Sequence, residues 1–160
     1  MAYSPTSSSA FTRFATSPVI PTTTSIPWAP LAGRILVSAI FILSGLTKFT
    51  DWQGTASYMA AHGLPLTPLL LPIAAIVEIA GGLAVLLGAR ARVAALVLFL
   101  YLIPATLIFH NFWQETGMEY VNQMHHFLKN LAIMGGLALI VGLGPGLPSI
   151  DHWNMRRATR

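Results

Sequence analysis

The sequence predicts an all-α polytopic membrane protein, a bundle of four transmembrane helices with a disordered N-terminal tail. Of its 160 residues, 54% are hydrophobic and only 9% are charged, and the mean hydropathy is +0.66. An average soluble domain carries about 25% charged residues, so this chain has too few polar side chains to cover a surface in water. The apolar residues form four blocks, each near the roughly 20 residues that cross ~30 Å of hydrocarbon as a helix.

The N-terminal segment, residues 1–29, is rich in Ser, Thr and Pro. It holds twelve Ser or Thr and four Pro, with Arg13 as its single charge. So little apolar surface does not offset the entropy lost on ordering, and the sequence predicts a flexible cytoplasmic tail. A secretory signal needs a continuous apolar region that this segment lacks, whereas its acid-poor, Ser-rich opening resembles an organellar transit peptide.

A transmembrane domain is predicted over 30–148, followed by a basic cytoplasmic tail over 149–160. Its four spans are expected at about 31–49, 66–89, 93–112 and 127–147. Prolines inside the second and third spans do not exclude helices, because neighbouring helices re-satisfy the freed carbonyls in a membrane bundle. The loop over 50–64 carries helix start and stop signals and is expected to form a short interfacial helix.

Tryptophan and arginine mark the membrane boundaries and the orientation. All four tryptophans fall just outside a span, as interfacial aromatic rings do. The loops over 50–65 and 113–126 contain no Lys or Arg, and the opposite side collects arginines. These are Arg13, Arg90, Arg92, Arg156, Arg157 and Arg160. The positive-inside rule therefore places both termini in the cytoplasm, and a multi-pass protein of the bacterial cytoplasmic (inner) membrane is expected.

Composition excludes several classes of function. The chain has no cysteine, which excludes disulfides, thiolate metal sites, iron–sulfur ligation and thiol relays. Its net charge is +4, but its nine Lys and Arg stand one or two at a time around the apolar blocks. That pattern indicates orientation in a membrane and not a nucleic-acid footprint. The expected partners are membrane lipids and proteins of a membrane complex, with no nucleic acid.

Polar residues inside the spans are the candidates for function, because an ionisable group there costs at least ~2.5–3.5 kcal/mol on insertion scales. The candidate polar or ligand-binding site comprises Arg34, Lys48, Glu78, His110, Lys129 and Asn130. Residue spacing puts Arg34 and Lys48 on one face of the first span. Ala74 and Gly82 lie one turn on either side of Glu78, as at a close contact between helices.

The alternating directions of the helices set the depth of each candidate. Glu78 is expected near the midplane, Arg34 near the cytoplasmic end, and the other four near the outer end. Such a basic outer pocket suits an anionic or carbonyl-bearing head group. Alternatives remain open: Lys48 and Arg34 can be snorkelling anchors. His110 can be an interfacial histidine, and Glu78 can be a structural ion pair or a proton or ligand site.

No metal site is expected. His110, His125 and His126 would supply three imidazoles, but adjacent histidines diverge by about 100° on a helix. Haem between helices needs paired histidines at membrane depth, which the spans do not provide. No covalently bound cofactor is expected either, and quinone is the candidate ligand. Catalytic residues stay unassigned, and whether the chain is an enzyme is left open.

Three segments together resemble the DoxX family of small four-helix membrane proteins. They are LAGRILVSAIFILSGLTKF with Arg34, Gly45 and Lys48, VEIAGGLAVLLG with Glu78, and HHFLKNLAIMGG with Lys129 and Asn130. The resemblance covers about residues 31–147. It implies a bundle tied to membrane redox chemistry, including the quinone-reacting membrane part of thiosulfate oxidation. It also implies that Arg34, Lys48, Glu78, Lys129 and Asn130 belong to a shared polar site.

Two functions are therefore weighed. In the first, the chain is a subunit of a membrane-associated redox complex that interacts with quinone or an anionic small molecule, while a partner protein delivers electrons. In the second, the chain is a non-catalytic membrane scaffold or accessory subunit, whose buried ion pairs fix the helix register. A permease is less favoured, because no internal repeat frames a central site.

Overall fold

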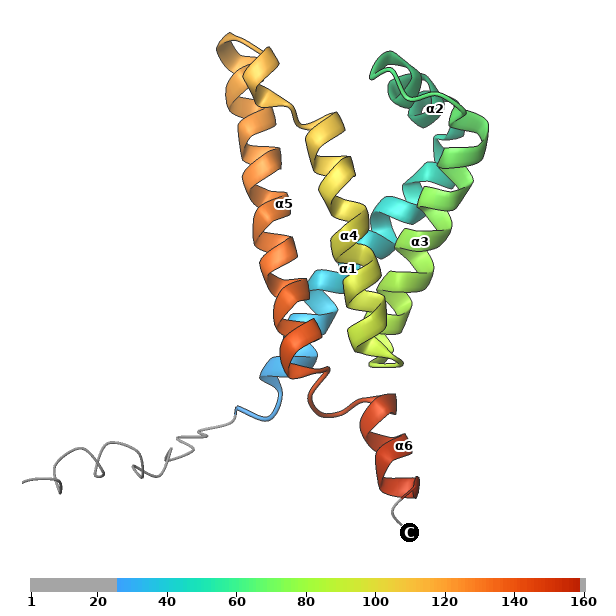
Figure 1. Cartoon of the computed structure of the whole chain (residues 1–160), viewed down its shortest axis with the longest axis vertical. Helices are drawn as coiled ribbons and strands as arrows, with labels where there is room; N and C mark the ends of the chain where they lie inside the picture. Colours follow the sequence, from blue (N-terminus) through green and yellow to red (C-terminus); the bar gives the residue numbers. More distant parts are fainter. Residues whose placement is uncertain (1–25, 159–160) are drawn as a thin grey trace, which may run out of the picture.

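Residues 26–158 are described in the computed structural model, and this part of the chain is helical throughout, with no strand (Figure 1). The flexible tail expected over 1–29 lies, up to residue 25, outside the described residues. The helices in chain order are α1 Ala29–Thr50, α2 Trp52–Ala61, α3 Thr67–Leu87, α4 Ala91–Phe109, the 3-10 turn η2 Phe112–Gln114, α5 Gly117–Leu143 and α6 Ile150–Ala158. Four of these elements, α1, α3, α4 with η2, and α5, are long and apolar enough to span a membrane, so the predicted fold class is confirmed.

The fourth span differs in length from the prediction. It is expected over 127–147, whereas α5 begins at Gly117 and ends at Leu143. Its first turns carry polar residues such as Glu119 and Gln123, which lower the hydropathy without weakening the helix. A hydropathy block therefore measures the apolar part of this helix rather than its whole length.

The C-terminal segment is helical where the sequence suggests only a basic tail. Asp151 lies in the first turn of α6, and Arg156 and Arg157 lie in its last turn, which complements the helix dipole at both ends. The Asp151 carboxylate also accepts hydrogen bonds from the backbone N–H groups of Arg90 (2.7 Å) and Ala91 (2.9 Å). One side chain thus caps the start of α4 and holds α6 beneath the bundle.

Glycines allow α1 and α3 to approach closely. Gly45 of α1 lies against the Ala75 carbonyl and the Glu78 side chain, and Gly82 of α3 lies against Phe41 and Ile42. A β-carbon at either position would meet these atoms at or below van der Waals distance. The two helices therefore pack backbone to backbone, as small residues permit between membrane helices, and this contact brings the end of α1 beside the middle of α3.

The helices form a bundle that is closed at one end and spread at the other. We call the end with α2 and η2 the upper end, and the end with the α3–α4 turn and α6 the lower end (Figure 1). The apolar core lies toward the lower end and includes Phe41, Val85, Leu98 and Leu137. Toward the upper end, α4 and α5 diverge from α1, α2 and α3 (Figure 1).

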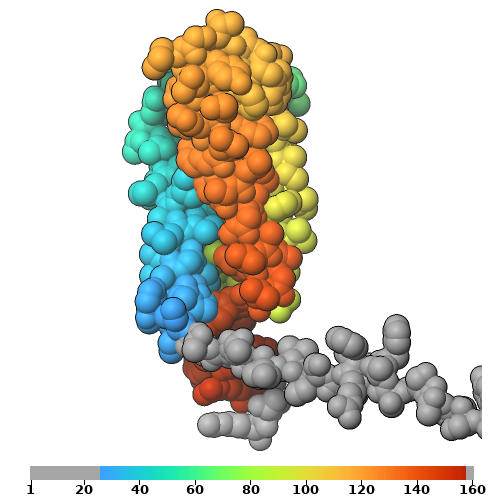
Figure 2. All heavy atoms as spheres, turned by 90° about the vertical axis from the view of Figure 1, so that its left-hand side faces the viewer, coloured from blue at the N-terminus to red at the C-terminus, as the bar shows by residue number. Residues whose placement is uncertain are grey.

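Large apolar side chains cover much of the outer surface of the spans. Leu36 and Leu43 of α1 are 74% and 63% exposed, and Leu139 of α5 is 63% exposed. A soluble protein does not expose so many contiguous apolar side chains. These faces are therefore the lipid-contacting surface, and Figure 2 shows α1 and α5 as two neighbouring columns on one such side of the molecule.

Candidate functional site

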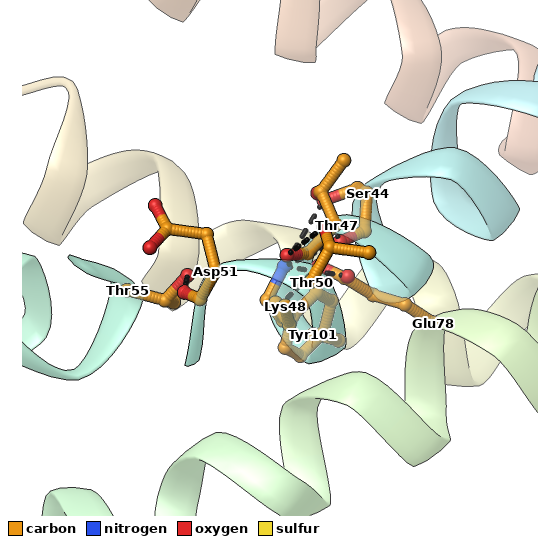
Figure 3. A network of polar contacts seen from close by, with 8 residues as sticks. All are labelled: Ser44, Thr47, Lys48, Thr50, Asp51, Thr55, Glu78 and Tyr101. Atoms are coloured by element: carbon orange, nitrogen blue, oxygen red, sulfur yellow. Dashed lines mark hydrogen bonds and ion pairs between the residues drawn. The ribbon is translucent and has the colours of Figure 1, made fainter. Parts of the chain in front are cut away.

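A buried ion pair joins α1 to α3 at the centre of the bundle. Lys48 Nζ lies 2.7 Å from Glu78 Oε2, and the two side chains are 15% and 6% exposed. Tyr101 of α4 donates a hydrogen bond of 2.7 Å from its hydroxyl to Glu78 Oε1. Three helices therefore converge on one carboxylate, each of whose oxygens has a partner, as the dashed lines in Figure 3 indicate.

Lys48 has no donor left for a ligand. Besides the Glu78 carboxylate, its ammonium group donates to Ser44 Oγ at 3.0 Å and approaches the Ser44 carbonyl at 3.4 Å. An ammonium group has three N–H donors, and all three are directed at protein atoms. Lys48 is thus fixed in place one turn above Ser44 on α1.

A cavity of about 300 Å³ lies beside this ion pair, between the diverging helices. Most of its wall is apolar, with side chains such as Ile40, Phe41 and Ile133. Its polar wall residues are Ser44, Lys48, Glu78, Tyr101, Lys129 and Asn130, with Thr55, Tyr58 and His110 toward the upper end. An apolar cavity with a few convergent polar groups is the usual form of a small-molecule site.

Asn130 is held at the cavity wall by α4. Its amide Nδ2 donates a hydrogen bond of 3.0 Å to Thr106 Oγ1, which itself donates to the Leu102 carbonyl at 2.6 Å. Asn130 is 7% exposed. These bonds orient the side chain and fix the relative position of α4 and α5 at this depth.

A second polar chain runs along the upper part of α5. Gln123 Nε2 donates to Glu119 Oε1 at 2.6 Å, so its amide oxygen faces His110 Nδ1 at 2.9 Å. Because an amide oxygen only accepts, His110 donates from Nδ1 in this contact. His110 stacks on His126, with ring centroids 5.1 Å apart.

Lys129 is the cation at the cavity with donors to spare. Its ammonium group makes one hydrogen bond in the described part of the chain, to His126 Nδ1 at 2.9 Å. Its side chain is exposed, whereas Lys48 is largely buried. Lys129 therefore retains N–H groups for a ligand, which Lys48 does not.

Aromatic residues cover the upper mouth of the cavity. The rings of Tyr58 in α2 and of His62, the residue after α2, lie 5.4 Å and 5.3 Å from the Phe109 ring at the end of α4. The Tyr58 hydroxyl also approaches the Phe109 carbonyl at 3.5 Å. Burial raises the pKa of the Tyr58 hydroxyl, and the negative charge of Glu119 raises it further, so Tyr58 stays protonated and neutral around pH 7.

Arg34 lies away from this cavity, so the expectation that it shares the polar site needs correction. Its guanidinium donates to the Leu86 carbonyl at 3.0 Å and to the Pro148 carbonyl. Arg34 is 1% exposed. The reason is its position near the start of α1, which places it at the lower end beside the last turn of α3. There it joins α1 to α3 and to the segment that leads into α6.

The other five candidates, Lys48, Glu78, His110, Lys129 and Asn130, all line the cavity. Tyr101 was not among the site residues predicted from the sequence, although a signal for it exists. Glu78 and Tyr101 lie equally far along the chain from the Ala89–Arg90 bond in the α3–α4 turn. In an antiparallel pair of helices such positions lie at the same depth, so a polar residue at 101 is the expected partner of Glu78.

The three histidines named above are not gathered into a metal site. His110 and His126 stack on each other, and no group of three His, Asp, Glu or Cys side chains fit to hold a metal ion occurs among residues 26–158. His126 Nδ1 is already occupied by Lys129.

Four apolar spanning helices around a cavity with a buried ion pair define a small polytopic integral membrane protein. The family model described as DoxX matches residues 29–111. The chain is 35% identical over 122 residues to the inner membrane protein YphA of Escherichia coli (strain K12), which covers 76% of this chain and 87% of YphA. The chain belongs to the DoxX family.

Two further relatives match a similar share of the chain. The inner membrane protein YqjF of Escherichia coli (strain K12) is 39% identical over 122 residues, covering 76% of this chain and 88% of YqjF. The membrane protein Rv3486 of Mycobacterium tuberculosis (strain ATCC 25618 / H37Rv) is 29% identical over 141 residues, covering 79% and 81%. No solved structure matches the chain at a significant level.

Proposed function

We propose that the chain is the quinone-binding membrane subunit of a redox complex. The observation that carries this proposal is the cavity of about 300 Å³ beside the Lys48–Glu78 pair. This volume is at the small end of ligand sites, which span about 300–1,000 Å³. It suits a single substituted ring, and its apolar wall suits the faces of that ring.

The polar groups of the wall fit a quinone head group. A quinone carbonyl needs a donor, and Lys129 has N–H groups beyond the one directed at His126. The two ammonium groups and one carboxylate of the wall leave it with a net positive charge. That charge favours an electron-rich carbonyl oxygen and also an anionic small molecule, which is the second ligand class that this wall supports.

The Lys48–Glu78 pair places an ammonium group and a carboxylate beside the position proposed for the ring. A quinone, when bound, supplies two-electron chemistry in which two protons are also taken up. Glu78 lies in the middle of the span α3, and Tyr101 and Lys48 direct an O–H and an N–H group at it. The chain has no cysteine to ligate an iron–sulfur cluster, so the electrons are assigned to a flavin or iron–sulfur cofactor of a partner protein.

A second candidate, a non-catalytic scaffold or accessory subunit, is favoured by α6. Arg34 and Asp151 anchor this helix to α1, α3 and α4. Trp153 of α6 remains 54% exposed, with the guanidinium of Arg157 3.7 Å from its ring centroid. Aromatic and Arg side chains of this kind are typical anchors of protein interfaces, so α6 is a docking element for a partner under either proposal.

The protein is assigned to the bacterial inner membrane with its lower end in the cytoplasm. The names of the two Escherichia coli relatives support the membrane. The orientation rests on the arginines at the lower end, among them Arg90, Arg92 and Arg157. At the upper end, α2 and η2 contain no Lys or Arg. The positive-inside rule assigns the arginine-rich side to the cytoplasm. Because the chain has no cysteine, single cysteines at Thr116 and Ser149 would report the two sides through an impermeant thiol reagent. Labelling at Ser149 in intact cells would contradict this orientation.

The test of function is purification in mild detergent, followed by mass spectrometry of bound proteins and extraction of bound quinone. The proposal expects a stoichiometric redox partner together with quinone. Lys129→Ala should lower the recovered quinone without lowering the amount of protein. A partner recovered with no quinone in unaltered protein would contradict the proposal and favour the scaffold.

A further inference from the structure

The contact between α1 and α5 has a defined register. The two helices run antiparallel, and Val37 Cγ2 lies 3.2 Å from the position that a β-carbon on Gly136 would occupy. Moving along α1 toward the upper end and back along α5 by the same number of residues pairs Ile40 with Ile133 and then Ser44 with Lys129. All four of these residues line the cavity.

The cavity lies at the level of the upper two of these pairs. Val37 and Gly136 touch, but no hydrogen bond or ring contact within residues 26–158 joins α1 to α5 at the level of Ser44 and Lys129. Lys129 is exposed, and Ile40 and Ile133 are half-buried. The cavity therefore reaches the molecular surface between these two helices.

The other sides of the cavity are bridged by specific contacts. The hydrogen bond between Tyr101 and Glu78 joins α4 to α3, and that between Asn130 and Thr106 joins α5 to α4. At the upper mouth, Tyr58 of α2 stacks over Phe109 of α4. Within residues 26–158, no such bridge joins α1 to α5.

The opening lies within the lipid-contacting surface. Leu36 and Leu43 of α1 are 74% and 63% exposed, and Leu128, next to Lys129 on α5, is 53% exposed. A ligand that reaches this opening comes from the hydrocarbon of the membrane, because these flanks are apolar.

We propose that the gap between α1 and α5, bordered by Ile40, Ser44, Lys129 and Ile133, is a lateral entrance for an amphiphile with a polar head and a long apolar tail. The head passes Lys129 and reaches the cavity beside Glu78, while the tail stays between α1 and α5 in contact with lipid. This inference rests on the proposed function, because it defines how the ligand of the same cavity enters and which class of molecule it is.

Photolabelling tests the position of the tail. The probe is a benzoquinone whose long alkyl tail carries a photoreactive diazirine, added to the full chain in lipid vesicles. If the ligand enters here, the probe should label α1 near Leu43 and α5 near Leu128, and excess unlabelled tailed quinone should suppress this labelling. Labelling confined to the lipid face of α3 and α4, such as Ile76 and Leu100, would overturn the entrance while leaving the cavity as a site.

A pair of bulky variants provides a second, independent readout. Ile133→Trp narrows the entrance, whereas Leu139→Trp places the same side chain on an exposed lipid face of α5. Association of the tailed quinone should slow by about tenfold or more in Ile133→Trp and stay unchanged in Leu139→Trp. Equal association rates in the two folded variants would overturn the proposal of this entrance. If neither the diazirine-bearing quinone nor the tailed quinone binds the unaltered protein, both the proposed function and the proposed entrance are wrong.

Discussion

Tyr101 donates a hydrogen bond of 2.7 Å to the Glu78 carboxylate across the α3–α4 hairpin, on the oxygen that Lys48 does not occupy. A carboxylate at this depth is stable only when its charge and its lone pairs have partners. The Tyr101–Glu78 bond therefore does two things. It gives the second oxygen of the buried carboxylate a hydrogen-bond donor, and it fixes α4 to the α1–α3 pair at the level of the cavity.

The Lys48–Glu78 pair predicts strong coupling between two substitutions. Glu78→Gln leaves a buried ammonium group without its anion, and Lys48→Met leaves a buried carboxylate without its cation. Each is expected to cost about 3–5 kcal/mol of the free energy of unfolding, and the double variant much less than the sum. Unfolding of the purified protein in mixed detergent micelles measures all three. Strictly additive effects would show that the pair carries no interaction of this kind.

Removing the Tyr101 hydroxyl should weaken the same network without leaving a charge unpaired. Tyr101→Phe is expected to lower the free energy of unfolding by about 1.5–3 kcal/mol, the usual contribution of a hydrogen bond to a charged group. Tyr120→Phe is the matched control, because Tyr120 is 38% exposed and its ring contact with Phe112 survives the change. Equal unfolding curves for the two variants would contradict a role for the Tyr101 hydroxyl.

Arg34 is predicted to anchor the C-terminal helix rather than to bind a ligand. Arg34→Lys keeps the positive charge, but an ammonium group lacks the planar guanidinium that donates to both the Leu86 and Pro148 carbonyls. Local opening of α6 should then increase, and trypsin should cleave after Arg157 about tenfold faster or more, since about 1.4 kcal/mol changes the opened population tenfold.

The control for this prediction is Arg90→Lys. Arg90 lies at the same end of the bundle, and the bond that α6 makes to it comes from the Arg90 backbone. Its cleavage rate should match that of the unaltered protein. Cleavage that is equally slow in Arg34→Lys would mean that the Asp151 contacts alone hold α6.

The close approach of α1 and α3 gives a prediction about glycine. Gly45→Ala should lower the amount of folded protein, because the added methyl meets the Ala75 carbonyl and the Ile79 side chain. Gly135→Ala has no atom within 4 Å of the added methyl and should be neutral or stabilising, since Ala favours a helix over Gly by about 1 kcal/mol. Size-exclusion profiles of both variants in detergent measure the difference. A loss confined to Gly135→Ala would contradict this packing.

The span pattern could be predicted from the sequence because hydropathy is a local property. Counting residues along each span puts Glu78 near the midplane and Lys48 and Lys129 near the outer end, whereas all three line one cavity and Lys48 Nζ lies 2.7 Å from Glu78 Oε2. Arg34 shares a helix face with Lys48, but that face runs the length of α1 and meets different neighbours at its two ends. Sharing a face does not place two residues in one site.

The remaining features depend on contacts between distant segments. The nine residues of α6 are too few and too polar to form a helix alone, and Asp151 holds them against the start of α4. The cavity depends on how far the helices diverge, which no local pattern encodes. The Tyr101–Glu78 contact joins two helices, but it could have been predicted from the sequence, since the pairing follows from the position of the α3–α4 turn.

The most direct test of the account is whether the cavity binds a quinone. Titration of the purified protein with a benzoquinone that carries a long alkyl tail should give saturable binding. Ala105→Phe puts a ring into the cavity, and Ala39→Phe puts the same ring on the exposed face of α1. The account predicts that Ala105→Phe weakens binding by about tenfold or more, while Ala39→Phe leaves it unchanged. Equal binding by both folded variants would contradict the assignment of this cavity as the quinone site.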